Sequence, residues 1–573
     1  MEEKASSSEN GAKIEIDAKP PQESATSPSS DENKFDLDLL IDQIGPFGKF
    51  QLINYIIICI PICMAAMYTL SFAFTAGDLN FRCVIPECDA ADPSYSEPFV
   101  NFTIPREKDG FSFCKKFISI ANASDGNQCQ PEFFDTSNAE CCDEHVYEEG
   151  ENAIINEWDL GCKNEWKLTL VGTINLVSHT VCQPILGYVS DRFGRRTTFI
   201  LGLVLAATFG LIQSFSSSYV MFVILEFLAA GSGSSAYNCG FILGMELVGP
   251  EKYGVGNFIL NVFFAFGEAL LGVIAMLTKD WRWLLRIAYV PALIVIAYPW
   301  LIPESVRWLA NKNRLKEVAE IIESAARMNK SKLTPAAVEM LNRAKSDGGT
   351  LEVKVEDEQE KELEETGLIS VMKSPIILIR LIKCLFCWFT AFYVFFCITL
   401  NSVSAVGNKY VNFILICLIE IPAAGFSGKL MEKFGRRLIL SINFIISGVC
   451  AVVIIFTANA PTFVQIILLI LSKLCVTMAL LTGYVYTAEL FPTKVRLTLL
   501  SLCSTLGSIG GALVPATLHL EQYVDNLSLI ASAVLTILAG VTIFFGPETM
   551  NHTLPDTLQE AEQIGKKPKP ENT

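Results

Sequence analysis

The chain has 573 residues, of which 51% are hydrophobic and 18% are charged, and its formal net charge is −16. This composition, with a mean hydropathy of +0.39, excludes an ordinary soluble enzyme and is typical of a polytopic membrane protein. The first fifty residues are rich in Ser, Glu and Pro, and we expect residues 1–48 to form a disordered cytoplasmic tail. The apolar run that follows lies too far from the start to be a cleaved signal peptide.

Twelve apolar runs are long enough to cross a bilayer, which takes ~20 residues each. They begin near Leu52, Leu168, Thr197, Tyr219, Gly256, Leu284, Ile376, Val411, Leu438, Phe463, Thr498 and Leu527. The sequence therefore predicts an all-α membrane protein with six-helix bundles over residues 49–302 and 376–546. A cytoplasmic linker, residues 303–375, separates the bundles, and residues 547–573 form a cytoplasmic C-terminal tail.

The linker contains one amphipathic helical pattern. Its apolar stripe consists of Leu315, Val318, Ala319, Ile322, Ala325 and Ala326. The charged stretch from Glu356 to Glu365 has no such pattern, and we expect it to be mobile.

Most of the negative charge lies in one large loop between the first two runs. Residues 77–166 carry 19 Asp and Glu against 6 Lys and Arg, a net charge of −13. Seven of the 18 cysteines lie there too: Cys83, Cys88, Cys114, Cys129, Cys141, Cys142 and Cys162. We expect no core in this loop, so the cysteines favour disulfides in an oxidising compartment, with one thiol left over. Zinc is the competing interpretation, but no His stands at ligand spacing, and we expect no metal.

The short loops on the other face are basic, which predicts the orientation of the chain. Their bases are Arg192, Arg195, Arg196, Lys429, Lys433, Arg436, Arg437, Lys494 and Arg496. Short basic loops stay in the cytosol, so we expect a multi-pass plasma-membrane protein with both termini cytoplasmic. The acidic loop is then outside, where its sequons at Asn101 and Asn122 can be glycosylated.

A ten-residue charged turn occurs twice, 241 residues apart, as GYVSDRFGRR from Gly187 and GKLMEKFGRR from Gly428. Two further landmarks repeat at nearly the same offset: Glu246-Leu with Glu489-Leu, and Pro-Glu-Ser with Pro-Glu-Thr. The repeats predict two pseudo-symmetric halves related by an axis along the membrane normal.

The twin turns have the residues of a cytoplasmic latch. Their glycines allow close approach and a sharp turn, and their arginines can hold carboxylates across a helix seam and release them when it opens. The candidate gating residues are Asp191, Arg192, Arg195, Arg196, Glu246, Glu432, Arg436, Arg437, Glu489 and Arg496. The alternative is that these charges only set the topology.

Several motifs together resemble a known family. They are the first twin turn, Asp280-Trp-Arg-Trp283, Pro303-Glu-Ser-Val-Arg-Trp308, Ala488-Glu-Leu-Phe-Pro492, Pro547-Glu-Thr549, Gly45-Pro-Phe-Gly48 and the Cys-rich loop. From about Ile44 to about Gly565 the chain resembles the major facilitator superfamily, specifically the organic cation/anion/zwitterion transporters (solute carrier family 22). The resemblance implies polyspecific transport of small organic ions by alternating access, usually without ATP hydrolysis.

Buried ionisable residues near mid-span are the first candidates for a binding site. Glu420 is similar to an acid of the family's cation and carnitine carriers, and it either contacts substrate or pairs with Lys473. The family's charged position before the Gly510-Gly511 pair is neutral Ser508 here. Asn261, Phe264 and Glu268 share one helical face. We hypothesise that Glu268 supplies the charge that Ser508 lacks, the alternative being a neutral or protein-paired carboxyl.

The resemblance also places aromatic side chains at or next to the cavity, where their faces attract cations. They are Tyr237, Phe264, Trp388, Phe395 and Tyr484, although each alone is as well explained by helix packing. Glu226 is a weaker third acid, because Phe227 replaces the base expected beside it.

These features favour a secondary transporter or facilitator of small organic cations, for which the membrane potential alone can supply the driving force. The alternatives are a carnitine-like zwitterion or organic anion transporter, a sugar transporter, and a non-transporting receptor or scaffold. No Walker motif, metal cluster or nucleophile arrangement indicates an enzyme. We expect no cofactor and no nucleic-acid partner. The expected partners are a small organic ion and the lipid bilayer, with the chain functional as a monomer or associating through its loop.

Overall fold

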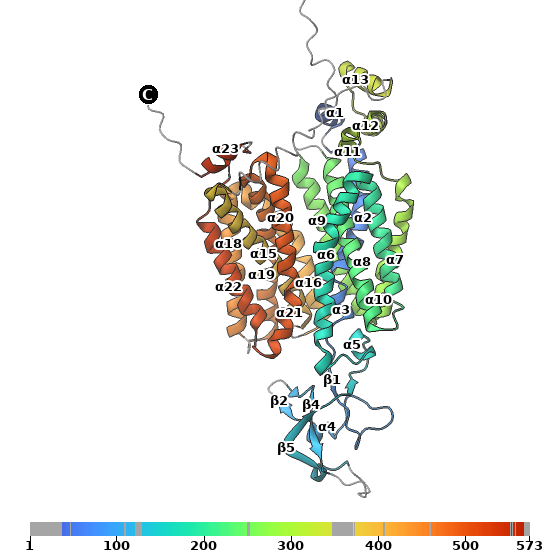
Figure 1. The fold of residues 1–573 in the computed structure, drawn as a ribbon, viewed down its shortest axis with the longest axis vertical. Helices are drawn as coiled ribbons and strands as arrows, with labels where there is room; N and C mark the ends of the chain where they lie inside the picture. Colours follow the sequence, from blue (N-terminus) through green and yellow to red (C-terminus); the bar gives the residue numbers. More distant parts are fainter. Residues whose placement is uncertain are drawn as a thin grey trace, which may run out of the picture.

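A computed structural model describes residues 37–45, 47–107, 110–120, 129–248, 252–346, 371, 373–404, 407–457, 460–550, 552, 554–555 and 557–565. The described chain forms two groups of long helices side by side, coloured blue to green and yellow to red in Figure 1. The large loop projects from one end of the bundle and the linker helices from the other. These ends are called the loop end and the linker end.

The first half contains the first six spans. They are α2 (Lys49–Leu70) with its short continuation α3 (Phe72–Thr75), α6 (Trp166–Phe193), α7 (Arg195–Gln213), α8 (Tyr219–Glu246), α9 (Tyr253–Thr278), and α10 (Trp281–Tyr289) continued by the 3₁₀ helix η4 (Val290–Trp300).

The second half repeats this order. Its helices are α15 (Pro375–Ser404), α16 (Lys409–Leu418) with α17 (Glu420–Phe434), α18 (Arg436–Phe456), α19 (Thr462–Leu490), α20 (Thr493–Ala512) with α21 (Val514–His519) and η5 (Leu520–Gln522), and α22 (Leu527–Phe544).

Eleven helices of the described chain are long and apolar enough to cross a membrane. The twelfth, α6, is more polar, but it is 28 residues long and packs along α8 within the first half. Each helix begins within a few residues of a predicted apolar run, so the predicted all-α fold with two pseudo-symmetric halves is confirmed.

The eighth span is broken where a candidate site residue lies. Helix α16 ends at Leu418 and α17 begins at Glu420. Pro422 has no backbone N–H to donate to the carbonyl of Leu418, which weakens the helix there. The break leaves the Glu420 carboxylate in the first turn of α17, where the partial positive charge of the helix N-terminus favours it. Interrupted helices of this kind build binding sites in transporters.

The Cys-rich loop is folded, and the expectation that it lacks a core is wrong. Cys83, Ile85, Val100, Ile104, Phe134 and Cys142 form a small buried cluster. Around it lie three antiparallel two-stranded sheets, which pair β1 (Phe81–Cys83) with β6 (His145–Tyr147), β2 (Arg106–Glu107) with β3 (Gly110–Phe111), and β4 (Lys115–Ser119) with β5 (Phe134–Cys141). Short helical turns connect them: α4 (Val100–Thr103), η1 (Pro131–Phe133), α5 (Ile154–Glu157) and η2 (Cys162–Asn164). The apolar residues are few, but disulfides bring them together.

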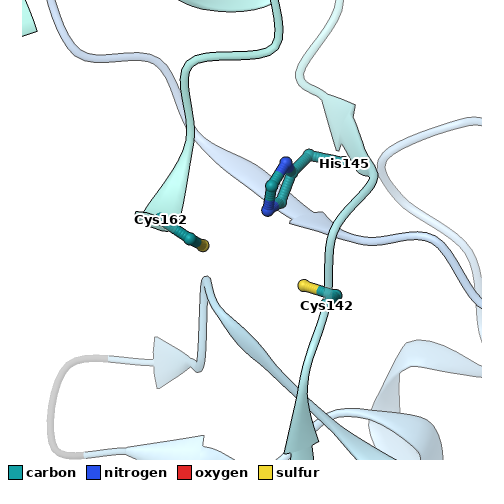
Figure 2. Close-up of side chains that lie close together, drawn as sticks. All are labelled: Cys142, His145 and Cys162. Carbon is teal, nitrogen blue, oxygen red and sulfur yellow. The ribbon is translucent and has the colours of Figure 1, made fainter. Parts of the chain in front are cut away.

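Six of the seven loop cysteines form disulfides, which join Cys83 to Cys142, Cys88 to Cys129 and Cys114 to Cys162. Cys141 is a free thiol and is exposed. No His stands at ligand spacing in the sequence, but the structure places His145 of β6 beside the sulfurs of Cys142 and Cys162 (Figure 2). Both sulfurs belong to disulfides and are not thiolate ligands, and His145 instead pairs with Asp159 at 2.8 Å.

Of the two sequons, Asn101 is exposed in α4 and Asn122 lies outside the described residues. The charged stretch from Glu356 to Glu365 also lies outside them.

The linker packs on the first half at the linker end, through α11 (Val306–Asn311), α12 (Leu315–Asn329) and α13 (Pro335–Ser346). The predicted apolar stripe of α12 is buried. Asn329 donates to the carbonyl of Ile44 and accepts from the amide of Phe50 at 2.8 Å. Residues 1–48 are therefore not wholly disordered: α1 (Leu37–Ile44) is an amphipathic helix that packs on α12. At the other terminus, α23 (Leu558–Gln563) contacts α15.

The halves meet along α9 with α16 and α17, and along α6 with α20 and α21. Toward the loop end, the ring of Phe74 lies 5.6 Å from Tyr410 and 4.9 Å from Phe413, centroid to centroid. Phe74 belongs to the first half and its two neighbours to the second. Aromatic packing therefore closes the seam at the loop end.

Candidate functional site

Glu420 is paired with a base of its own half. Lys473 of α19 places its Nζ 2.8 Å from Oε1 of Glu420 and donates to Thr399 Oγ1 at 2.7 Å. The same Nζ lies 3.1 Å from the centroid of the Phe395 ring. Lys473 is fully buried and Glu420 is 8% exposed. A carboxylate, a hydroxyl and a ring face thus enclose one ammonium, and Glu420 is neutralised by the protein.

Glu268 has no such partner. It projects from α9 of the first half toward Glu420 and Cys417 of the second, and its exposure is 0%. Neither of its carboxylate oxygens accepts a hydrogen bond of normal geometry from a described residue. Lys473 is the base nearby, and it is already paired with Glu420. Glu268, Glu420 and Lys473 together carry one uncompensated negative charge when all three are ionised.

Aromatic side chains flank these charges from both halves. Tyr237 of α8 packs on Phe264 with ring centroids 4.9 Å apart and lies within electrostatic range of Glu268, Glu420 and Tyr484. Trp388 of α15 packs on Tyr484 at 4.3 Å and donates to Thr487 at 3.0 Å. Tyr484 is 39% exposed.

The remaining candidates bond within their own helices or half. Asn261 donates to the carbonyl of Asn257 and Ser508 donates to the carbonyl of Ser504. Glu226 is 1% exposed and accepts from Asn175 at 2.6 Å and from Gln213 at 2.5 Å. Glu226 is therefore a hydrogen-bonded acid of the first half.

Charged residues join the halves at the loop end, which sequence reasoning missed. Glu151, from the loop, forms an ion pair with Lys409 at the start of α16. Glu165, just before α6, accepts from Gln522 of the second half. The pKa of Glu165 is raised to about 7, chiefly by burial. The negative charge of Asp78 raises it further, whereas the hydrogen bond from Gln522 lowers it. These contacts join residues that are far apart in the sequence, so they cannot be predicted from the spacing of residues along one segment.

At the linker end, the first twin turn holds its own half together. Gly194 turns the chain between α6 and α7 at φ +106°. Arg195 contacts Asp191 at 2.5 Å and Glu246 of α8 at 4.0 Å. Glu304 accepts from the backbone N–H of Arg196 at 2.9 Å, at the N-terminus of α7. The Arg196 guanidinium donates to the carbonyl of Ile302, whereas Arg192 lies against Tyr188 and Phe193.

The second twin turn repeats this network. Gly435 has φ +90°, Arg436 pairs with Glu489 at 3.0 Å, and Glu548 accepts from the backbone N–H of Arg436 at 2.9 Å. Arg437 lies 4.0 Å from Glu548. Glu432 is exposed, and Arg496 donates to the carbonyl of Phe491. All these contacts lie within one half.

Glu304 and Glu548 were not among the predicted site residues. Their signal was present, since Pro-Glu-Ser and Pro-Glu-Thr repeat at the offset of the turns. Each places a carboxylate on the N-terminus of the helix that follows the turn, where helix charge favours an acid.

Two six-helix halves with ionisable side chains buried at their seam define a class of protein, the alternating-access membrane transporter. A family model described as Major Facilitator Superfamily matches residues 165–515 and 400–564. Organic cation/carnitine transporter 2 of Rattus norvegicus is 30% identical over 539 residues, which cover 92% of this chain and 94% of that one. Solute carrier family 22 member 21 of Mus musculus is 29% identical over 545 residues, with coverages of 93% and 94%. The chain therefore belongs to the major facilitator superfamily and, within it, to solute carrier family 22.

Two further matches agree with this assignment. An organic cation transporter protein of Drosophila melanogaster is 26% identical over 560 residues, covering 94% of this chain and 96% of that one. The partially occluded inward-open structure of the xylose transporter XylE from E. coli superposes with a TM-score of 0.58 at 15% identity, covering 88% of this chain and 100% of that one. The similarity to the xylose transporter supports the assignment of the fold.

Proposed function

We propose that this chain moves small organic cations across the plasma membrane by alternating access. Two relatives that match over almost the whole chain are named organic cation transporter protein and organic cation/carnitine transporter 2. The basic short loops at the linker end support an orientation with both termini in the cytosol and the Cys-rich loop outside. The chain acts as a monomer and performs no covalent chemistry on its substrate.

The charge balance at the seam carries this proposal. Lys473 neutralises Glu420, whereas Glu268, between the halves, has no basic partner of its own among the described residues. Tyr237 and Phe264 pack on each other and belong to the first half, as Glu268 does. An ammonium substrate can pair with Glu268 at a lower desolvation cost than either charge alone, and the rings add ~0.5–2 kcal/mol per contact. An anion would meet an unpaired carboxylate and a lysine that is already engaged.

The gating role falls on two sets of charges. Glu151–Lys409 bridges the halves at the loop end and must separate before that face opens. The twin-turn networks bind helices within each half at the linker end. They keep each half rigid, so that the halves rock against each other as bodies. Asp191, Arg195, Arg436 and Glu489 therefore affect turnover rather than substrate affinity.

The test is counterflow in vesicles that contain the purified chain. Vesicles loaded with one unlabelled compound take up the same compound, labelled, from outside, and tetraethylammonium, carnitine and p-aminohippurate are each tested in this way. We expect counterflow of tetraethylammonium and little of p-aminohippurate. Counterflow of carnitine alone would assign a zwitterion carrier, and counterflow of p-aminohippurate alone an anion carrier. Absence of counterflow with every compound would favour a receptor.

Two variants locate the site. Glu268→Gln should lower the affinity for tetraethylammonium at least about tenfold, because it removes the unpaired charge. Glu226→Gln is the matched control, since Glu226 is equally buried but hydrogen-bonded by two amides that can flip to accept the new donor. Unchanged flux and unchanged affinity in Glu268→Gln would remove Glu268 from the site.

A further inference from the structure

Glu268 differs from the other acids buried at mid-span among the described residues. Glu226 accepts hydrogen bonds from two amides, and Glu420 has the Lys473 ammonium. Glu268 is fully buried, and neither of its oxygens accepts a hydrogen bond of normal geometry from a described residue. The groups that its carboxyl meets are the Glu420 carboxyl and the Cys417 thiol, and neither of them carries a positive charge. An ionised carboxylate left in this condition costs several kcal/mol, which is why such groups take up a cation or a proton.

The groups around Glu268 leave it no compensating charge. The titratable side chains facing it are Glu420 of α17, Lys473 of α19, Cys417 of α16 and Tyr237 of α8. On α2, Cys63 packs against the neighbouring Gly267, so closely that a Cβ there would lie 2.1 Å from its carbonyl oxygen. Among these groups Lys473 is the base, and it is held by Glu420, Thr399 and the Phe395 ring.

We propose that Glu268 is the proton-coupling site of the carrier, and that this chain exchanges one proton for each monovalent organic cation. The proposal rests on the proposed function and adds the coupling ion. With the site empty, the Glu268 carboxyl holds a proton. When a cation binds, the O–H bond breaks, the proton leaves to the open side, and the carboxylate pairs with the cation.

Coupling follows from the location of Glu268 at the seam. Helix α9 of the first half and α16–α17 of the second close over this side chain, so it loses contact with water when they meet. A bare carboxylate opposes that closure, whereas a protonated or cation-paired one does not. The carrier therefore switches between its outward-open and inward-open forms when Glu268 holds a proton or a cation. It does not switch when Glu268 holds neither. No net charge crosses in a complete cycle.

The test uses tetraethylammonium, which has a permanent charge and no proton of its own. Vesicles with an acidic interior and an alkaline exterior are clamped at zero potential by valinomycin with equal potassium on both sides. We expect labelled tetraethylammonium to accumulate inside, up to about tenfold for each pH unit, since one proton is exchanged for one cation. At equal pH, an imposed inside-negative potential should not produce accumulation.

Glu268→Gln should lose the accumulation driven by pH while Glu226→Gln keeps it. A second measurement, of proton release on binding, tests the proposal even if the Glu268→Gln variant has lost all transport. Tetraethylammonium added to the purified wild-type chain in weakly buffered detergent should release about one proton per site, and none from Glu268→Gln. Counterflow in the wild type without pH-driven accumulation, or binding without proton release, would overturn the coupling and leave cation transport standing. Absence of any tetraethylammonium flux or binding would overturn the proposed function itself.

Discussion

Lys473 reaches Glu420 at 2.8 Å in the interior of the second half, and its ammonium also lies against the face of Phe395. A carboxylate with an aromatic face is the arrangement expected to bind a substrate cation, but here a protein side chain occupies it. The acid that the family resemblance favoured is thus neutralised internally. The unpaired acid, Glu268, comes from the other half.

The Glu420–Lys473 pair should behave as a unit in folding. Glu420→Gln or Lys473→Met alone leaves a buried charge without its partner and should lower stability by roughly 3–5 kcal/mol. The double variant removes both charges and should recover most of that loss. Thermal unfolding of the four proteins in one detergent gives the coupling free energy. Strictly additive losses would show that the two charges do not interact.

Gly194 and Gly435 should be the sensitive glycines of the twin turns. Both have positive φ, and a Cβ would lie 2.3 Å from Glu304 Oε2 in the first turn and 2.7 Å from Glu548 Oε2 in the second. Replacement by Ala should destabilise by about 1–3 kcal/mol from backbone strain, with loss of the acid contact in addition. Gly187→Ala and Gly428→Ala are matched controls within the same motifs, because nothing lies within 4 Å of a Cβ there. Similar melting shifts at control and turn glycines would contradict this account.

The two turns should contribute unequally to turnover. Asp191 and Glu432 are both exposed, but Asp191 pairs with Arg195 at 2.5 Å, whereas the second turn relies on the ion pair of Arg436 with Glu489. Asp191→Asn should therefore slow counterflow several-fold more than Glu432→Gln, with little change in substrate affinity. Initial rates over a range of tetraethylammonium concentrations separate the two quantities. Equal rates for both variants would argue against the asymmetry.

Closure at the loop end should depend on pH through Glu165. Its pKa is raised to about 7 in the closed arrangement, chiefly by burial, whereas an exposed glutamate titrates near 4.3. The closed face binds the proton more tightly, so it should be favoured as pH falls from about 7 toward 5 and lose this advantage as pH rises above 7. Spin labels at Trp166→Cys and Tyr523→Cys, with Cys141→Ser to remove the exposed thiol, report the opening. Glu165→Gln should abolish the pH response, and an unchanged response would assign it to other groups.

The ion pair across the loop end should set how readily that face opens. Glu151→Lys leaves two like charges facing each other and should shift the same spin-label distances toward the open form, as should Lys409→Glu. Exchanging both charges should restore closure. Failure of the exchanged pair to recover any closure would mean that the aromatic packing at Phe74 and the hydrogen bond between Glu165 and Gln522 hold the seam without the ion pair.

Much of this architecture is determined locally along the chain. Twelve runs of apolar residues predict twelve spans because a bilayer demands backbone hydrogen bonds within each segment. The repeated turns predict two related halves, since a glycine, an acid and two arginines at constant spacing specify the same helix junction twice. The amphipathic stripe of α12 predicts its buried face residue by residue.

The sequence by itself thus determined the spans, the duplication and which ionisable residues lie buried near mid-span. Only the tertiary structure decided how those residues are paired, because Glu268, Glu420 and Lys473 lie on three helices and an ion pair depends on side-chain geometry rather than on spacing along the chain. The same reason applies to the core of the loop and to its disulfide partners, which the folding of residues 77–166 brings together from distant positions.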